Sequence, residues 1–307
     1  MISIIIPLYN KESYIKRAIQ SVLHQSFTEY EIIVVNDGST DNGVDVIKKI
    51  DDTRIKLIHQ ENKGVSAARN RGLQEAKYDW VAFLDADDAW SPEFLSTMMR
   101  LKDLFPDCDV CASAYKHVSQ DGHERNLILT RMPFGGKEGI LSNYFEVAAF
   151  SNPPICSISV TVRKSALIEI GGFPLDIKSG EDLLTWARLA ANHKIAYCTE
   201  PLATFFPERE TYYSKPSRIP EEDDPVGKEL VSLRDRYPST IGLDDYIAQW
   251  HKMRASIYLR LPKQSSKCRK EIVLAKQFSH AFDKKLLLYR LLSYAPYSLR
   301  MKLFSKL

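Results

Sequence analysis

The chain has 307 residues, of which 44% are hydrophobic and 26% are charged. This composition excludes a largely disordered protein, and a chain of this length can bury a substantial core without disulfides. The net charge is only +3, but residues 252–307 hold 14 of the 42 Lys and Arg and 2 of the 39 Asp and Glu. An acidic body is therefore followed by a strongly basic tail, which needs either a partner or a packing surface.

The five cysteines do not predict a disulfide framework, because their number is odd and the chain is long, and they favour a reducing compartment. The apolar run at the N-terminus is about five residues long and lacks the basic segment of a secretory signal. No window reaches the ~18 uninterrupted apolar residues of a membrane-spanning helix. We therefore expect a cytoplasmic protein.

The first hundred residues alternate short apolar segments with segments of helical periodicity. This alternation predicts βαβ units and an α/β fold with a mainly parallel, Rossmann-like sheet flanked by helices. The apolar segments predict strands at residues 2–9, 31–35, 55–59 and 80–84. The periodic segments predict helices at residues 12–25, 41–50, 64–76 and 92–104.

The rest of the chain is less regular. Residues 108–118 and 157–163 have the pattern of strands, and the Gly- and Pro-containing stretch 130–156 predicts a loop with some helix. Residues 207–225 hold four prolines and an acidic run, which predicts a loop or linker. The sequence after this linker is helical in pattern and basic.

Polar residues follow three of the predicted strands, at the point where each strand ends. In open α/β sheets, ligands bind beyond the carboxyl ends of the strands. Three polar clusters on one edge are more than a stable fold requires, so they predict a ligand site. The clusters are Tyr9-Asn10, Asn36-Asp37 and Asp85-Ala86-Asp87-Asp88.

The acidic cluster at residues 85–88 directly follows an apolar strand. Neighbouring carboxylates repel one another, so the cluster is costly without a cation. Oxygen ligands suit Mg²⁺ or Mn²⁺, and three carboxylates leave coordination positions for the oxygens of a diphosphate. A solvated acidic turn that caps the next helix explains the same residues equally well when they are taken alone.

Two other segments contain candidate ligand contacts. Asp37 is an acceptor at a strand end and can receive an N–H of a nucleotide base or a hydroxyl, although an ordinary turn with a helix cap is the simpler explanation. Lys63 and Arg69 flank a small-residue segment that begins at Gly64, and either cation can meet a phosphate or the acidic cluster. The start of a surface helix is the alternative for that segment.

Glu181 and Asp182 are adjacent carboxylates at the predicted N-terminus of a helix that Gly180 opens. The helix dipole favours their ionised form at this position. One of them can therefore act as a general base on a hydroxyl, and plain N-terminal capping is the alternative.

Taken together and in this order, five segments resemble the motifs of the family 2 glycosyltransferases, which have the GT-A fold. The segments are SIIIPLYN at 3–10, VVNDGSTD at 34–41, NKGVSAARN at 62–70, FLDADD at 83–88 and GGF to GED at 171–182. The resemblance implies transfer of a sugar from a nucleotide-sugar donor, usually a UDP-sugar, with inversion at the anomeric carbon. It also implies a catalytic domain at 1–215, with a nucleotide-sugar half (1–105) and an acceptor half (106–215), and a helical C-terminal extension at 216–307.

The resemblance further implies roles for single residues. Asp182 matches the catalytic base, with Glu181 as the second choice. Asp87 matches the metal ligand of the D-x-D pattern, and Asp85 the residue near the ribose and the metal, which would be Mn²⁺ or Mg²⁺. Asp37 would accept a hydrogen bond from a uracil. The expected nucleotide-sugar contacts are Pro7, Tyr9, Asn10, Asp37, Lys63, Arg69, Asp85, Ala86, Asp87 and Arg209.

Arg209 belongs to this set because of a departure from the family pattern. Many relatives have a histidine-containing loop near the diphosphate at the corresponding position. Residues 205–211 of this chain contain no histidine, and Arg209 is the residue that could contact the diphosphate instead.

Residues 284–307 interleave basic with apolar and aromatic residues and contain no acidic residue. Such a stretch can lie on an anionic membrane surface, at the inner face of the cell membrane. It can equally be a C-terminal helix that packs on the body with its basic face in water. No nucleic-acid partner is expected, because no recognised binding module accompanies the charge.

The sequence thus predicts a metal-dependent hexosyl- or N-acetylhexosaminyltransferase that modifies a glycan or lipid-linked acceptor during synthesis of a surface polysaccharide. A nucleotidyltransferase on a similar sheet is one alternative, but such enzymes generally have a Gly-rich basic loop after the first strand, and this strand ends in Pro-Leu-Tyr-Asn. A non-catalytic nucleotide-binding protein on the same fold is the other, and the intact acidic motifs argue against it.

Overall fold

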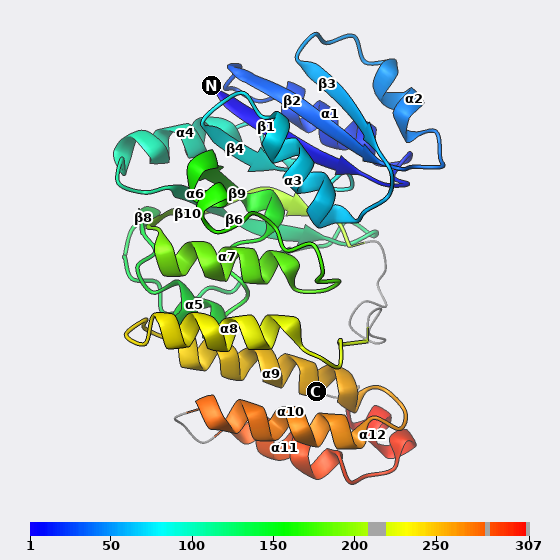
Figure 1. Ribbon diagram of the computed structural model, residues 1–307, viewed down its shortest axis with the longest axis vertical. Coiled ribbons are helices and arrows are strands. Elements are labelled where there is room, and N and C mark those ends of the chain that lie inside the picture. The colour runs from blue at the N-terminus through cyan, green and yellow to red at the C-terminus, as the bar shows by residue number, and fades with distance from the viewer. Residues whose placement is uncertain (208–218, 280–282, 305–307) are drawn as a thin grey trace.

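A computed structural model describes residues 1–207, 219–279 and 283–304 of the chain. A twisted sheet with helices on both faces forms one end of the molecule, and the C-terminal helices are stacked in layers at the other end (Figure 1). The strands in the described residues form one sheet of ten, with the main order β3-β2-β1-β4-β9-β6-β10-β5, while β7 pairs with β6 and β8 with β10.

The strands lie within a few residues of the predicted segments in the first half of the chain. They are β1 (Ile2–Leu8), β2 (Tyr30–Asp37), β3 (Ile55–Gln60), β4 (Trp80–Phe83), β5 (Ala89–Trp90), β6 (Val110–Val118), β7 (Glu124–Asn126), β8 (Glu138–Ile140), β9 (Val160–Arg163) and β10 (Ile195–Phe205). A short 3₁₀ turn, η1 (Ser157–Ser159), precedes β9.

The helices are interspersed with these strands up to β10, and the last five helices then follow one another. The first group is α1 (Ile15–Leu23), α2 (Gly43–Lys48), α3 (Val65–Glu75), α4 (Phe94–Leu104), α5 (Tyr144–Phe150), α6 (Lys164–Glu169) and α7 (Glu181–Asn192). The second group is α8 (Pro225–Arg236), α9 (Leu243–Leu259), α10 (Ser265–Phe278), α11 (Lys284–Leu292) and α12 (Tyr297–Phe304).

Strands β3, β2, β1 and β4 are parallel, which confirms the predicted βαβ units. Ile5 of β1 is paired with Ile33 of β2 on one side and Phe83 of β4 on the other. Because the strands share one direction, the residues that follow β1, β2 and β4 lie at one edge of the sheet.

The second half of the sheet is mixed. β9 lies between β4 and β6 and is antiparallel to both, whereas β10 is parallel to β6. The α/β class is therefore confirmed, but the mainly parallel arrangement is limited to the first half. An apolar run identifies a buried strand without giving its direction, and the direction of β9 depends on the long connection that precedes it.

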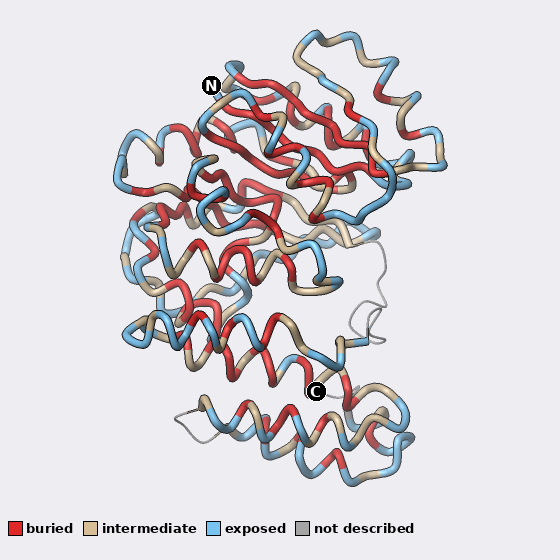
Figure 2. Tube along the Cα trace, in the orientation of Figure 1, coloured by how far each residue is buried: buried red, intermediate tan, exposed pale blue. Residues whose placement is uncertain are grey.

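Two cores cover the two faces of the sheet. Ile4, Ile6 and their neighbours pack against α1 and α4 on one face, while Ile5 and Phe83 pack against α3, α6 and α7 on the other. β1 is buried over its whole length, as its continuous apolar sequence requires. Figure 2 shows this burial along the central strands and the inner sides of the helices.

The helical C-terminal region divides between two cores. Val226 and Leu230 of α8 and Tyr246 and Trp250 of α9 belong to the same core as the sheet and α7. The second half of α9 forms a separate core with α10 and α11. α9 therefore connects the core of the sheet with the terminal helices. None of the described helices is long and apolar enough to cross a membrane.

Candidate functional site

The turns after β1 and β2 hold one another in place at the sheet edge. Asn10 has a left-handed backbone (φ 51°), and its Oδ1 accepts a hydrogen bond from the Thr40 backbone N–H at 2.8 Å. Its own N–H donates to Ser39 Oγ at 3.2 Å. Tyr9 is 48% exposed beside this turn, whereas Pro7 is buried within β1 next to Val35.

Asp37 is buried, and its carboxylate is occupied by the loop before α3. Oδ1 accepts from Gln60 Nε2 at 2.7 Å and from the Lys63 N–H at 2.9 Å, and Oδ2 accepts from the Gly64 N–H at 2.9 Å. The carboxylate thus fixes the loop of residues 60–64, while the Lys63 side chain is exposed. Contacts of Asp37 and Lys63 with a nucleotide stay predictions.

The acidic cluster forms a tight turn after β4, with the Asp88 N–H donating to the Asp85 carbonyl at 3.0 Å. Arg69 Nη2 donates to Asp85 Oδ1 at 2.7 Å, and Lys11 Nζ donates to Asp87 Oδ2 at 2.7 Å. Asp88 Oδ1 accepts from the Phe206 N–H at 2.8 Å. Each carboxylate therefore has one partner from another part of the chain, and Ala86 between them is buried.

These partners do not neutralise the cluster fully. Burial raises the pKa of Asp87, and the ion pair with Lys11 only partly offsets that rise. The pKa of Asp88 lies well above its ordinary value because of burial first and the charges of Asp85 and Asp87 second. Asp88 Oδ2 is buried and has no hydrogen-bond partner among the described residues. The cluster therefore has an excess of negative charge, which a bound cation would neutralise.

Asp85 and Asp87 fit a hard divalent cation. Arg69 and Lys11 each bind one carboxylate oxygen, which leaves the other oxygen of each group for a ligand. Carboxylate oxygens are the donors that Mg²⁺ and Mn²⁺ prefer.

A second group of potential ligand atoms, in Asp224, His251 and Glu271, lies within 4.8 Å of one another. Arg254 lies among them, with Nη1 3.3 Å from Asp224 Oδ1 and Nε 2.9 Å from Glu271 Oε1. The Arg254 guanidinium therefore already provides these two carboxylates with the positive charge that a metal ion would otherwise supply.

Gly180, Glu181 and Asp182 form the start of α7. Gly180 has a left-handed backbone (φ 86°) at the N-cap, which a glycine adopts without strain. Asp182 is half-buried, and its Oδ1 accepts from the Leu183 N–H at 2.8 Å. Burial raises the pKa of Asp182, while the charge of Arg69 opposes the rise. A carboxylate with a raised pKa is suited to take a proton from a hydroxyl.

Arg69 connects the acidic cluster with the start of α7. Its guanidinium is buried, and besides the bond to Asp85 its Nη1 lies 3.8 Å from Glu181 Oε1. Burial disfavours its charge, but Asp85, Glu181 and Asp182 outweigh that effect and raise its pKa. The structure thus brings Asp85, one of the two predicted metal ligands, and the start of α7 with the predicted base around one cation.

A cavity of about 310 Å³ adjoins Asp87. Arg17, which the sequence analysis did not single out, lines it, with its guanidinium carbon 3.7 Å from the centre of the Phe206 ring. Arg17 also donates a hydrogen bond to the Asp87 carbonyl. Lys11 was missed as well, although its place directly after the Tyr9-Asn10 motif was a usable signal.

Two tyrosines without a signal in the sequence lie near Asp182. Tyr144 comes from α5 and Tyr246 from α9, and their ring centres are 6.2 Å apart. Both are buried, which raises the pKa of each phenol, and the nearby Asp182 carboxylate adds to the rise. No local pattern in the sequence connects either tyrosine with residue 182.

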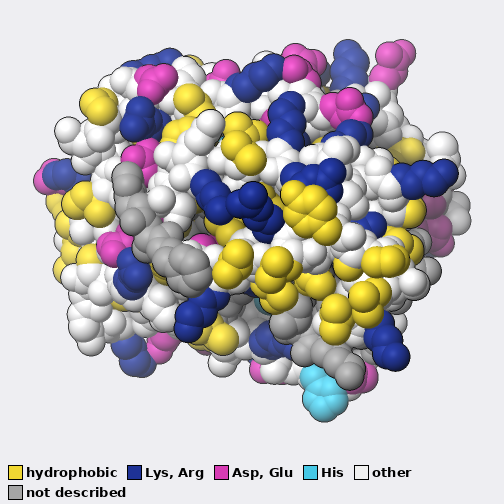
Figure 3. Space-filling model, turned by 90° about the horizontal axis from the view of Figure 1, so that it is seen from below, with side chains coloured by type: hydrophobic (Ala, Val, Ile, Leu, Met, Phe, Trp, Pro, Cys, Tyr) yellow, Lys and Arg dark blue, Asp and Glu magenta, His cyan; other side chains and the backbone are white. Residues whose placement is uncertain are grey.

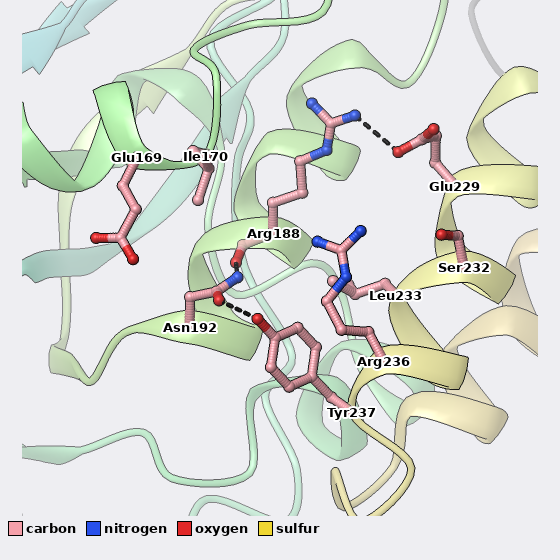
Figure 4. Close-up of a pocket in the computed structure, with 9 residues that line it drawn as sticks. All are labelled: Glu169, Ile170, Arg188, Asn192, Glu229, Ser232, Leu233, Arg236 and Tyr237. Carbon is pink, nitrogen blue, oxygen red and sulfur yellow. Dashed lines mark hydrogen bonds and ion pairs between the residues drawn. The ribbon is translucent and has the colours of Figure 1, made fainter.

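A larger cavity, of about 410 Å³, lies at the opposite end of α7 (Figure 4). Arg188 and Asn192 line it, and they are held by Glu229 and Tyr237. It contains none of the predicted site residues, so it is separate from the candidate site. Arg209 lies outside the described residues.

The comparisons with known proteins agree with this arrangement. Residues 3–165, about half of the chain, match the family model "Glycosyl transferase family 2". The chain belongs to this family. It is 41% identical over 204 residues to an uncharacterised glycosyltransferase of Nostoc sp. (strain PCC 7120), a match that spans 64% of this chain and 59% of that protein. It is 36% identical over 125 residues to TuaG, a Bacillus subtilis protein named for teichuronic acid biosynthesis, over 40% of this chain and 49% of TuaG.

The matches with curated glycosyltransferases are partial, and two further relatives are covered over about a third of their length (33% and 32%). Among solved structures, the chain resembles Staphylococcus aureus TarS, residues 1–349, in complex with UDP-GlcNAc. The TM-score is 0.65 at 19% identity, over 99% of this chain and 91% of that one. This likeness confirms the GT-A fold, and the matched region extends over the C-terminal helices.

Proposed function

We propose that this protein is an inverting glycosyltransferase that moves a sugar from a UDP-sugar to a hydroxyl of a glycan or lipid-linked acceptor. The observation that carries the proposal is the position of Arg69, which contacts Asp85 of the acidic cluster and Glu181 beside Asp182. A donor diphosphate at the cluster and an acceptor hydroxyl at Asp182 would then lie on the two sides of one guanidinium.

On the donor side, Asp85 and Asp87 would hold Mn²⁺ or Mg²⁺, which when bound supplies Lewis-acid stabilisation of the diphosphate's negative charge. Lys11 and Arg17 lie at Asp87 and offer further positive charge to that group. The loop fixed by Asp37 forms the other side of the nucleotide site, next to exposed Tyr9. These residues bind and orient the donor.

On the acceptor side, Asp182 removes the proton of the attacking hydroxyl. Its raised pKa makes it a better proton acceptor than an exposed aspartate, and the charge of Arg69 limits that rise and so favours the ionised carboxylate. Glu181 points to the same guanidinium and is the second choice for the base. A single displacement of this kind inverts the anomeric carbon.

The family and the name of TuaG support a place in the synthesis of a cell-surface polysaccharide, and TarS in its complex with UDP-GlcNAc supports a UDP-linked donor such as an N-acetylhexosamine. We infer the acceptor only as a class, a saccharide hydroxyl that is free in a glycan or attached to a lipid carrier.

The test uses the full chain with a panel of UDP-hexoses and UDP-N-acetylhexosamines, each with Mn²⁺, Mg²⁺ or EDTA. We expect release of UDP that depends on the metal and increases when saccharide acceptors are added, and we expect Asp182→Asn to abolish it. UDP release that is equal in the Asp182→Asn variant would overturn the role of the base. Release of pyrophosphate from UTP and a sugar phosphate would instead identify a nucleotidyltransferase.

A further inference from the structure

Helix α11 is apolar on two opposite faces. Leu286, Tyr289 and Leu292 are buried against α9 and α10 in the C-terminal core. On the opposite side, Leu287 is 42% exposed and Leu291 is 63% exposed. The first face explains how the helix packs on the body, and the second has no packing role among the described residues.

The exposed apolar face continues beyond α11. Tyr294, in the turn directly after α11, is 69% exposed. In α12, Leu299 is 46% exposed and Leu303, one turn later, is 41% exposed. Tyr297, the first residue of α12, is 41% exposed. The exposed apolar side chains thus follow α11 and α12 as one continuous series.

Basic residues accompany this series and acidic ones do not. Lys284, Lys285 and Arg290 of α11 and Lys302 of α12 are exposed, and residues 284–304 include no Asp or Glu. Seen from the end of the molecule where these helices lie, hydrophobic and basic side chains gather side by side (Figure 3). We call these residues the C-terminal face: Lys284, Lys285, Leu287, Arg290, Leu291, Tyr294, Tyr297, Leu299, Lys302 and Leu303.

We propose that the C-terminal face binds the anionic surface of a lipid bilayer, with α11 and α12 lying along the membrane plane. Leucines can enter the boundary between headgroups and acyl chains while lysines and arginines contact lipid phosphates, and tyrosines suit the interface between them. At 9 and 8 residues, the two helices are too short to cross a bilayer.

Charge complementarity selects this partner over two others. A second copy of the chain would place two positively charged faces against each other, which is unfavourable. A nucleic acid would satisfy the basic residues but offers phosphates and polar edges to the exposed leucines. A bilayer with anionic headgroups satisfies both kinds of side chain at once.

The fold connects this face rigidly with the candidate site. α9 packs Tyr246 and Trp250 into the core beside Asp182, and one and a half turns later it packs Ala255, Tyr258 and Leu259 under α10 and α11. Membrane binding would therefore hold the acceptor side of the site at a fixed place relative to the bilayer. Its benefit for a lipid-linked acceptor rests on the proposed function, whereas the binding itself does not.

The test is flotation of the full chain with vesicles of phosphatidylcholine alone or mixed in equal parts with phosphatidylglycerol, at low and high salt. We expect the protein to float with the mixed vesicles, less so at high salt, and not with phosphatidylcholine alone. The double variant Leu287→Ser/Leu291→Ser should lose binding at least about tenfold, because two exposed leucines no longer enter the lipid. Ile168→Ser, which changes an isoleucine of α6 that is 60% exposed, is the matched control and should float like the wild type.

Two double lysine variants test the contribution of the basic residues to vesicle binding. Lys284→Gln/Lys285→Gln should weaken binding, while Lys48→Gln/Lys49→Gln, two exposed lysines at the end of α2, should leave it unchanged. Unchanged circular dichroism and melting temperature would show that the variants fold, as their exposure predicts. Failure of the wild type to float with anionic vesicles would overturn the proposal. Equal flotation of the Leu287→Ser/Leu291→Ser variant would also overturn it. The same holds if sedimentation shows that the wild type is a dimer and that this variant is a monomer.

Because vesicle binding is measured without donor or acceptor, its failure leaves the proposed transferase activity standing. An absence of UDP release with normal flotation would overturn the proposed transferase activity and leave the membrane binding standing.

Discussion

Gly180, the residue before the two candidate bases, is packed directly against the indole ring of Trp250 in α9. A Cβ built at position 180 would lie 2.7 Å from Cη2 and 3.0 Å from Cζ3 of that ring, closer than real Cβ contacts. Trp250 is in turn held by Asp224, whose Oδ1 accepts from the indole Nε1 at 3.0 Å. Helix α9 therefore supports the turn that precedes the two candidate bases.

The variant Gly180→Ala tests this contact. The left-handed backbone alone should cost about 1–2 kcal/mol, and the overlap with Trp250 about 1–3 kcal/mol more. Because the strain lies next to Asp182, sugar transfer should fall at least about tenfold. Urea unfolding and initial rates of UDP release measure the two effects.

Gly171→Ala is the matched control. Gly171 has nearly the same backbone (φ 83°), but a Cβ there meets nothing within 4 Å. It should lose only the stability that the backbone strain explains and keep its activity. In the double variant Gly180→Ala/Trp250→Leu, part of the loss should be recovered, and strictly additive losses would show that the contact with Trp250 is unimportant.

Replacement of Asp182 by Asn should lower kcat by about 10²–10⁴-fold, the usual contribution of a general base, while UDP binding is retained. Glu181→Gln, one residue away in the same turn, should have a much smaller effect. Because burial raises the pKa of Asp182 above its ordinary 3.8, kcat/KM should begin to fall with decreasing pH earlier than for an exposed aspartate. A larger loss of kcat in Glu181→Gln than in Asp182→Asn would mean that Glu181, and not Asp182, is the general base.

The sequence was sufficient for the first half of the fold because its strands are continuous apolar runs and its helices have a clear period. It was insufficient for β10, where Glu200 and Pro201 interrupt the pattern and the pairing with β6 shifts register. The order of strands beyond β4 also depends on long connections, which hydrophobic periodicity does not describe.

The candidate site shows the same division. The strand-end motifs indicated the acidic residues and Arg69, because each lies next to a turn or a strand end with a local signal. Trp250 and Tyr246 lie in a helix more than 60 residues after Asp182, where their pattern is that of ordinary core residues. Only the tertiary packing of α9 on α7 and α5 gives them a relation to the site.

Asp37 allows a test of the nucleotide side. Asp37→Asn should loosen the loop of residues 60–64. The Lys63 and Gly64 N–H groups donate to different carboxylate oxygens, and the amide nitrogen that replaces one oxygen cannot accept its bond. Hydrogen exchange at these two amides should become faster, and UDP should bind at least about tenfold more weakly.

Asp52→Asn is the control for that variant, since Asp52 also accepts a backbone hydrogen bond, from Arg54, but lies in the turn before β3 rather than at the end of β2. It should leave UDP binding unchanged. Faster exchange at Lys63 and Gly64 with undiminished UDP binding would show that the loop is structural only.

Asp88 predicts an unusual dependence of stability on pH. Its folded-state pKa lies well above the ordinary 3.8, because the carboxylate is buried beside Asp85 and Asp87. As pH rises above about 4, the unfolded chain gives up this proton before the folded chain does, so the free energy of unfolding falls until the folded pKa is passed. Ionisation of this buried carboxyl group therefore reduces the stability of the folded protein.

Asp88→Asn should remove that penalty, because the amide stays neutral and its Oδ1 can still accept from the Phe206 N–H. We expect the variant to be more stable than the wild type at pH 8 by about 1–2 kcal/mol and nearly equal at pH 4. Asp107→Asn, at a side chain that is 82% exposed, should change neither value. Urea unfolding of the ligand-free proteins at both pH values measures the difference. An Asp88→Asn variant that is less stable than the wild type at pH 8 would mean that the charged carboxylate is already compensated within the fold, and that the acidic cluster does not require a cation.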